Sequence, residues 1–155
     1  MVSSEPTLQP KGTTAYVSEE NRRVFISYSY GEDQQNKEEN IRLAEEHIRP
    51  LLHSLGFDVL TFRENVRFGP TDETTTHYIQ SSRVVIGILT KDCQTGSGSW
   101  EPKPNIPDEI GRALRSNKNK IVIPIEEEGV ELRKYSNAMT IINPNYKLFF
   151  KRDLN

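Results

Sequence analysis

The sequence predicts an α/β fold in which helices cover both faces of a parallel β-sheet of four to five strands, the three-layer, doubly wound arrangement. Four short apolar runs rich in β-branched residues supply the strands, and helix-compatible stretches separate them along the chain. The runs occupy residues 24–26, 57–60, 84–89 and 121–125. The third run is the most apolar, and we therefore expect it near the centre of the sheet.

Bulk composition limits the classes of function. The 155 residues suffice for one domain, and the polar, proline-containing segment 1–22 predicts a flexible leader ahead of a folded unit at 23–155. The 20 basic and 22 acidic side chains give a net charge of −2, which argues against a nucleic-acid partner. No apolar run of membrane length and no signal peptide is visible, so we expect no membrane partner.

Cysteine and histidine usage indicates a reducing compartment and no metal centre. Cys93 is the single cysteine, which excludes an internal disulfide. The three histidines, His47, His53 and His77, lie far from Cys93 in the chain and show no metal-ligand spacing. We therefore expect a cytoplasmic protein with neither a bound metal nor a cofactor.

The first half of the chain predicts a strand, a long helix and a second strand. Residues 23–29 form the first expected strand, and the helix that follows buries one apolar face. That face carries Ile41, Ala44, Ile48, Leu51 and Leu55. We expect a kink or a break at Pro50 and the end of the helix at Gly56, before a strand at 57–62.

The next elements continue the alternation of helices and strands. After a loop over 63–70, Thr71 or Asp72 can cap a short helix that ends near Ser82. The third strand then spans 83–89, the most apolar part of the chain.

The last third of the chain begins with a long loop over 91–105 and a helix from about 107 to 116. The fourth strand spans 121–125, and the acidic run 126–128 after it predicts a solvated turn. A further apolar stretch at 139–142 could supply a fifth strand.

Three turns leave the carboxyl edge of this sheet, where parallel α/β proteins bind their ligands. They bring together hydroxyl groups, aromatic rings, a guanidinium and a carboxylate, a mixture that suits a polar, ring-bearing ligand such as a nucleotide. The candidate residues are Ser27, Tyr28, Ser29 and Tyr30 after the first strand, Arg63 and Asn65 after the second, and Glu109 after the long loop. The alternative is an ordinary solvated sheet edge.

Glu109 and Trp100 each have a second explanation. An acid in the first turn of a helix interacts favourably with the helix macrodipole, which accounts for Glu109 without catalysis. Glu101 and Asp108 compete with it for a catalytic role. Trp100 could stack on a base or a nicotinamide, or it could serve only as a packing residue. No phosphate-binding glycine pattern follows any expected strand.

Four motifs occur in order between residues 23 and 125. They are Val24-Phe25-Ile26-Ser27-Tyr28-Ser29, the stretch from Gly56-Phe57-Asp58-Val59 through Arg63 to Gly69, Ile79-Gln80-Ser81-Ser82-Arg83-Val84-Val85-Ile86, and Glu109-Ile110-Gly111-Arg112-Ala113-Leu114 with the strand at 121–125. Their order and spacing resemble a TIR (Toll/interleukin-1 receptor) domain, with its opening strand, BB loop, third strand and catalytic helix. The segment 103–111 also resembles the TIR-like nucleotide-binding proteins of bacterial defence systems.

The resemblance implies a TIR-type, flavodoxin-like fold and, for the enzymes of the family, cleavage of the nicotinamide–ribose bond of NAD+. The catalytic glutamate of those enzymes corresponds to Glu109. The implied substrate contacts are Ser27, Tyr28, Ser29, Tyr30, Arg63, Asn65 and Trp100, and the implied assembly residues of the BB loop are Val66, Arg67, Phe68 and Gly69. NAD+ is then a substrate, other TIR domains are partners in an active homo-oligomer, and the setting is prokaryotic antiviral defence signalling.

Two features depart from the enzymatic pattern. Enzymes of the family commonly carry Trp four residues before the glutamate, where this chain has Asn105, and Trp100 lies nine residues before it. A C-terminal helix after the fifth strand is not evident in 141–155. A non-catalytic TIR assembly module and a nucleotide sensor are therefore the alternatives to an NAD+-cleaving enzyme.

Overall fold

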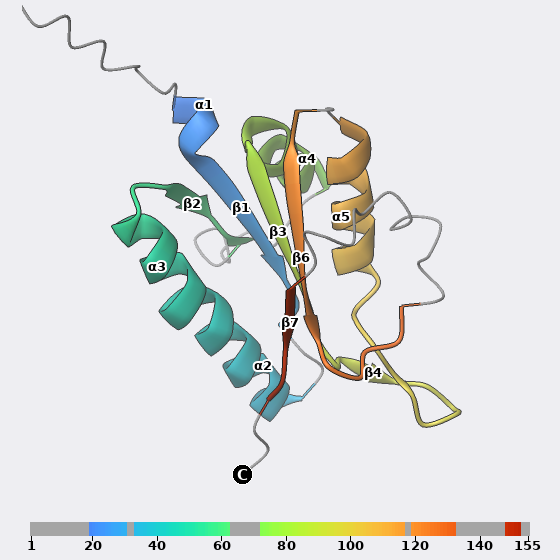
Figure 1. Cartoon of the computed structure of the whole chain (residues 1–155). Helices are drawn as coiled ribbons and strands as arrows, with labels where there is room; N and C mark the ends of the chain where they lie inside the picture. Colours follow the sequence, from blue (N-terminus) through green and yellow to red (C-terminus); the bar gives the residue numbers. More distant parts are fainter. Residues whose placement is uncertain (1–18, 31–32, 63–71, 117–118, 133–147, 153–155) are drawn as a thin grey trace, which may run out of the picture.

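The computed structural model describes residues 19–30, 33–62, 72–116, 119–132 and 148–152. Its centre is a five-stranded, all-parallel sheet in the order β2-β1-β3-β6-β7. The strands are β1 (Arg23–Tyr28), β2 (Asp58–Leu60), β3 (Val84–Leu89), β6 (Ile121–Glu127) and β7 (Leu148–Phe150). The predicted three-layer, flavodoxin-like α/β fold is confirmed, with the apolar strand β3 in the middle of the sheet (Figure 1).

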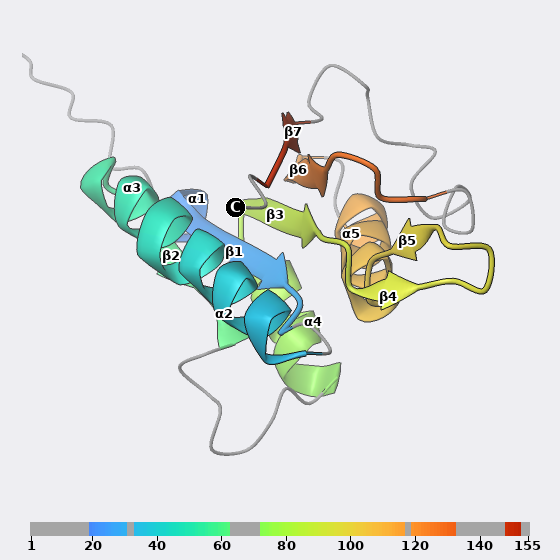
Figure 2. The same ribbon diagram turned by 90° about the horizontal axis from the view of Figure 1, so that it is seen from below.

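Helices cover both faces of the sheet. They are α1 (Glu19–Arg22), α2 (Gln34–Ile41), the π-helical segment η1 (Arg42–Ile48), α3 (Arg49–Ser54), α4 (Asp72–Ser81) and α5 (Asn105–Ser116). α2, η1 and α3 form one continuous rod on one face, and α4 and α5 lie on the other face (Figures 1 and 2). The short helix α1 leads directly into β1 from within the predicted leader, whose residues 1–18 lie outside the described part of the chain.

The helical rod accommodates Pro50 without a break. The helix continues from η1 into α3, and Pro50 lies in the first turn of α3. Proline has no N–H and its ring clashes with the carbonyl one turn earlier in a regular α-helix. The wider π-helical turns just before Pro50 provide a different register at that point. Gly56 then ends the rod with a φ of +86°, as predicted.

Two predictions for the segment before α5 are wrong. The segment 91–105 is not a plain loop, because β4 (Cys93–Gln94) and β5 (Trp100–Glu101) pair within it as an antiparallel hairpin. α5 begins at Asn105 rather than near Pro107, so Glu109 lies beyond the first helical turn.

The prediction of a solvated turn over the acidic run 126–128 holds only for Glu128, which is an exposed turn residue. Glu126 and Glu127 are the last residues of β6, and both are buried. The Glu127 carboxylate accepts the N–H of Lys91 at 2.8 Å and lies 3.3 Å from Nε of Arg152. Buried carboxylates are tolerated when they are paired in this way. The predicted strand at 139–142 lies outside the described residues, and the fifth strand of the sheet is β7.

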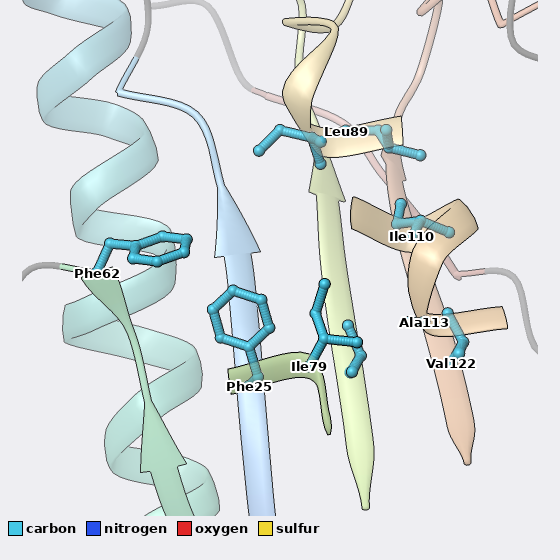
Figure 3. Close-up of a cluster of buried hydrophobic side chains, with 9 residues drawn as sticks. Phe25, Phe62, Ile79, Leu89, Ile110, Ala113 and Val122 are labelled. Carbon is cyan, nitrogen blue, oxygen red and sulfur yellow. The ribbon is translucent and has the colours of Figure 1, made fainter. Parts of the chain in front are cut away.

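Two apolar cores flank the sheet, because successive residues of each strand point to opposite faces. In β1, Phe25 packs against α4 and α5, whereas Val24 and Ile26 pack against the α2–α3 rod. Figure 3 shows the first core, in which the ring of Phe25 meets that of Phe62 edge to face at 5.2 Å and Ile79 and Ile110 close the layer. Burial of each such side chain stabilises the fold by roughly 1.5–3 kcal/mol.

Helix α5 lies directly on Gly87 of β3. A Cβ at this glycine would be 2.3 Å from Cδ1 and 2.4 Å from Cγ1 of Ile110, which is fully buried. Gly87 is also the residue of β3 that pairs in register with Ser27 of β1. Since Ile110 follows Glu109 in the chain, the close packing at Gly87 sets the height of Glu109 over the sheet.

We predict that Gly87→Ala lowers the free energy of unfolding by about 1–3 kcal/mol, because the added methyl group overpacks the α5–β3 contact. Urea denaturation of the purified protein measures this change. Gly96→Ala is the matched control, since a Cβ at that position meets nothing within 4 Å. Adding Ile110→Val to Gly87→Ala should recover part of the loss by removing Cδ1. Equal stability of the Gly87→Ala and Gly96→Ala variants would contradict the packing argument.

Candidate active site

Ser27 and Glu109 meet at the carboxyl end of the sheet. The Ser27 hydroxyl donates a hydrogen bond to Oε2 of Glu109 at 2.5 Å, across 82 residues of sequence. Both groups are buried, with Ser27 at 0% and Glu109 at 5% exposure. Two residues predicted from separate turns are thus in direct contact at the edge where ligands of such sheets bind.

The local structure explains why these two side chains converge. Ser27 is the penultimate residue of β1, and its side chain points to the face that α4 and α5 cover. Glu109 lies on the buried side of α5, together with Ile106, Ile110 and Ala113. These spacings of three and four residues define one face of a helix. A carboxylate on this face has to enter the layer between helix and sheet.

Burial raises the pKa of the Glu109 carboxyl to about 7, well above the ordinary value of 4.5. The hydrogen bond from Ser27, the positive charge of Arg112 and a hydrogen bond from the Asn105 side chain all lower this pKa, but they do not offset the loss of solvation. Asp108 adds a smaller repulsive contribution that raises it. The pKa of Glu109 therefore lies near neutral pH, in the range suited to acid–base or electrostatic catalysis.

The macrodipole explanation fits Asp108 better than Glu109. Asp108 is the acid in the first turn of α5, and it is exposed to solvent. It forms an i,i+4 ion pair with Arg112 at 2.9 Å. Glu109 lies one residue further along the helix and is buried with a raised pKa, a position that costs free energy instead of stabilising the helix.

The site contains two residues that were absent from the predicted set. Asn105 and Arg112 lie four residues before and three residues after Glu109, a helical spacing that places them near its carboxyl group. Arg112 is also held by α4, because it donates to Asp72 at 2.6 Å and to Thr76 at 3.3 Å. The i,i+3 and i,i+4 spacing within α5 is the sequence signal that identifies both residues.

Tyr28 lies on the opposite face of the sheet from Glu109. Its hydroxyl donates to Oε1 of Glu45 in the α2–α3 rod at 2.8 Å, and its side chain belongs to the core on that side. Burial and the Glu45 carboxylate raise the pKa of the Tyr28 hydroxyl. Tyr30 packs on the same face of the sheet, and its ring centroid lies 5.5 Å from that of Tyr28. The structure therefore separates the two tyrosines from the Ser27–Glu109 contact.

The other predicted residues divide into two groups. Ser29 is buried, and its carbonyl accepts a hydrogen bond from Asn40 in α2 at 3.0 Å. Trp100 lies in β5 and lines a cavity of about 580 Å³ that neither Ser27 nor Glu109 lines. Outside the described residues lie Arg63, Asn65, Val66, Arg67, Phe68 and Gly69.

A buried polar network lies at the same edge of the sheet, where β1 and β3 end. Asn40 donates to Oγ1 of Thr90 at 3.2 Å and to Oδ1 of Asp92 at 3.3 Å, and all three side chains are buried. The second carboxylate oxygen of Asp92 accepts the N–H of Lys103 at 3.0 Å, two residues before α5. The network thereby joins the ends of β1 and β3 to the segment that leads into the helix of Glu109.

Comparison with known proteins assigns no family, because no protein-family model matches the chain and no curated protein matches it. Among the described residues, no group of three or more His, Cys, Asp and Glu side chains could hold a metal ion. Within the same part of the chain, no helix combines the length and apolar character needed to cross a membrane.

We predict that Glu109→Gln stabilises the protein at alkaline pH. An acid whose pKa rises from 4.5 in the unfolded chain to about 7 in the folded protein destabilises the fold increasingly as pH rises through this window, by about 3 kcal/mol above pH 8. Gln keeps an oxygen that can accept from Ser27 but carries no charge. Its free energy of unfolding should exceed that of wild type by about 1–3 kcal/mol at pH 8.5 and by much less at pH 5.

Thermal or urea denaturation at the two pH values measures this difference. Glu73→Gln, which neutralises an exposed acid on α4, is the control and should show no comparable pH-dependent gain. If Glu109→Gln were less stable than wild type at both pH values, the carboxylate would be a stabilising part of the fold and not a strained one.

Proposed function

We propose that the protein is an NAD+ nucleosidase that cleaves the bond between nicotinamide and ribose, with Glu109 as the catalytic carboxylate. The single observation that supports this best is the buried Ser27–Glu109 contact at the carboxyl edge of the sheet, with the pKa of Glu109 near neutrality. Strongly perturbed carboxyl groups at such positions are more common in functional sites than in structural ones. The ordered TIR-like motifs around both residues select this reaction among those that a carboxylate can promote.

The chemistry requires a negative charge next to the ribose. When the glycosidic bond breaks, its electron pair moves to the pyridinium nitrogen and neutral nicotinamide leaves, while positive charge develops on the ribose as an oxocarbenium-like species. A carboxylate held close to that ribose stabilises the charge, as it does in glycoside hydrolysis. Water then completes the reaction to ADP-ribose and a proton, or attack by the adenine gives a cyclic ADP-ribose isomer.

Burial of Glu109 makes this stabilisation selective for the transition state. In the free protein the carboxylate lacks solvation, so its ionised form is disfavoured. Positive charge that develops on the ribose provides the missing counter-charge, and the interaction is therefore stronger in the transition state than in the ground state. Ser27 holds the carboxylate in position and supports its ionised form through the hydrogen bond to Oε2.

The remaining parts of the proposal come from the TIR resemblance. Arg63 and Asn65 would contribute substrate contacts, and Val66, Arg67, Phe68 and Gly69 would serve assembly with further TIR domains. The protein would act in the cytoplasm of a prokaryote, in antiviral defence signalling. Since a second subunit can complete such a site, activity should rise more than linearly with protein concentration.

The direct test is release of nicotinamide from NAD+, followed by chromatography at high protein concentration. Glu109→Gln should lower the rate by about 10²–10³-fold, the usual effect of removing a preorganised electrostatic group. Glu73→Gln, which neutralises an exposed acid on α4, is the control and should change the rate by less than about threefold.

Two outcomes would contradict the proposal. One is the absence of nicotinamide release from wild type at high protein concentration, and the other is an undiminished rate in Glu109→Gln. Saturable NAD+ binding without any release would instead identify the protein as a nucleotide sensor. Mass spectrometry of the products distinguishes linear from cyclic ADP-ribose.

We also predict a pH profile for this activity. The rate should rise with pH through about 7 and level off above it, since the ionised form of Glu109 is the active one. Ser27→Ala removes a hydrogen bond that lowers the pKa of Glu109, so the rising limb should move to higher pH. A Ser27→Ala profile with an unchanged limb and only a lower plateau would contradict the positioning role of Ser27.

A further inference from the structure

A small polar cavity, of about 250 Å³, lies at the opposite end of the sheet from the Ser27–Glu109 contact. Its walls come from α1, the end of α4 and the residues that lead into β3 and β6. This is the end of the sheet at which β1, β3 and β6 begin (Figure 1). Two of the lining residues, Arg83 and Lys120, are cations, and no carboxylate from the described part of the chain lines the cavity.

The ammonium group of Lys120 is held against the end of α4. Its Nζ donates to the carbonyl of Ile79 at 2.5 Å and also to the carbonyl of Ser82. Ile79 belongs to the last turn of α4, whose carbonyls have no partner within the helix. Lys120 therefore offsets the partial negative charge of this helix end, which would otherwise repel an anion. These two contacts use two of the three N–H groups of the ammonium.

Arg83 places a second positive charge beside Lys120. The Ser82 carbonyl that Lys120 binds belongs to the peptide group between Ser82 and Arg83, and the carbonyl of Arg83 accepts the N–H of Ile121 at 3.0 Å. Burial and the positive charge of Arg83 both lower the pKa of the Lys120 ammonium. Within the described chain, the Arg83 side chain forms no hydrogen bond and no ion pair. Two like charges held together in this way repel each other, and an anion in the cavity would offset that repulsion.

The hydroxyl group of Ser82 adds a further donor at this cavity. Ser82 lines the cavity and is 2% exposed, and its Oγ makes no hydrogen bond to any described residue. Buried hydroxyl groups nearly always have a partner, because an unpaired one is costly. An oxygen acceptor in the cavity would provide that partner.

We propose that the cavity formed by Ser82, Arg83 and Lys120 binds a small oxyanion, with inorganic phosphate as its representative. The guanidinium of Arg83 offers parallel N–H donors that match two oxygens of such an ion, and the third N–H of Lys120 and the Ser82 hydroxyl can reach further oxygens. The volume is below the roughly 300–1,000 Å³ typical of sites for larger ligands, which suits an ion better than a nucleotide. The inference does not depend on NAD+ cleavage.

Titration calorimetry at constant ionic strength tests the site with inorganic phosphate, sulfate and phenyl phosphate. Phosphate and sulfate should each bind saturably at millimolar concentrations, since the three side chains offer donors that either ion can use. Added phosphate should also raise the thermal midpoint, because the ion binds only the folded protein. Phenyl phosphate should bind more weakly than phosphate, and tighter binding would overturn the assignment to a free ion. The absence of saturable phosphate binding at tens of millimolar would overturn the site.

Variants locate the ion. Arg83→Gln should weaken phosphate binding by about tenfold, because it removes a charge-assisted contact. Lys37→Gln, an exposed position on α2 outside the cavity, is the matched control and should bind phosphate as wild type does. Lys120→Met should weaken binding too, but it also removes two hydrogen bonds to the end of α4 and should lower stability. Arg83→Gln is therefore the deciding variant, and an affinity equal to that of Lys37→Gln would overturn the proposal.

Ser82→Ala separates a role in binding from a role in the fold. It removes a buried hydroxyl that has no partner among the described residues, so the ligand-free protein should be at least as stable as wild type. Phosphate binding should nevertheless weaken by about threefold, the effect of one neutral hydrogen bond. Unchanged phosphate affinity would overturn the contribution of this hydroxyl.

Glu109→Gln distinguishes this proposal from the proposed reaction. It should lower nicotinamide release and leave phosphate binding unchanged, because the two sites lie at opposite ends of the sheet. Loss of phosphate binding in Glu109→Gln would overturn the separation of the two sites. Phosphate binding that depends on Arg83 would support the oxyanion site whether or not the protein cleaves NAD+.

Discussion

The close approach of α5 to β3 at Gly87 is the constraint on which the candidate active site depends. A methyl group at that position would overlap Ile110, so the helix can lie at its observed height only because no side chain stands there. Gly87 pairs in register with Ser27, and Ile110 is the neighbour of Glu109. The same contact that closes the apolar core therefore also brings a carboxylate within hydrogen-bond distance of the serine on the adjacent strand. The position of the Ser27–Glu109 hydrogen bond is thus a consequence of the packing of Ile110 on Gly87.

The polar network around Asn40 holds the segment that leads into the N-terminus of α5. Asn40 joins the carbonyl of Ser29 to the Thr90–Asp92 pair, and Asp92 holds the backbone N–H of Lys103 just before α5. Such a network stabilises the structure only when every member is satisfied, because an unpaired polar group in this environment is costly. The contact between Asp92 and Lys103 joins the two ends of the segment that contains the β4–β5 hairpin. The network also brings the C-terminal Arg152 into the same group of contacts as the start of the helix of Glu109.

The sequence predicted those features that depend on periodicity and failed on those that depend on tertiary pairing. Buried parallel strands are continuous apolar runs, so the sheet and the central place of β3 could be read directly. The two-residue strands β4 and β5 carry no such pattern, and their pairing appears only in the fold. Glu127 looked solvated because its neighbours are acidic, whereas its partner Arg152 is remote in sequence. The meeting of Ser27 and Glu109 could be predicted because Ser27 lies near the end of one strand and Glu109 follows another, and the carboxyl ends of both strands lie at the same edge of the sheet. Strict alternation along β1 would also have placed Tyr28 on the other face, since adjacent strand residues never share one.

Two glutamates on opposite faces of β1, the partly buried Glu45 and the buried Glu109, show what separates a structural carboxylate from a candidate catalytic one. Glu45 and Glu109 each accept a hydroxyl from neighbouring strand residues, Tyr28 and Ser27. Burial would raise the pKa of Glu45, but its polar contacts, which include the hydrogen bond from Tyr28 and the guanidinium of Arg49 at 3.0 Å, outweigh it, and the pKa is lowered. Arg112 lowers the pKa of Glu109, but its guanidinium is already bound by Asp72 and Asp108, so burial dominates and the pKa rises. Glu45 has its counter-charge built into the fold. Glu109 forms no ion pair within the part of the chain that the structure describes, and a substrate that develops positive charge at this position would supply the counter-charge.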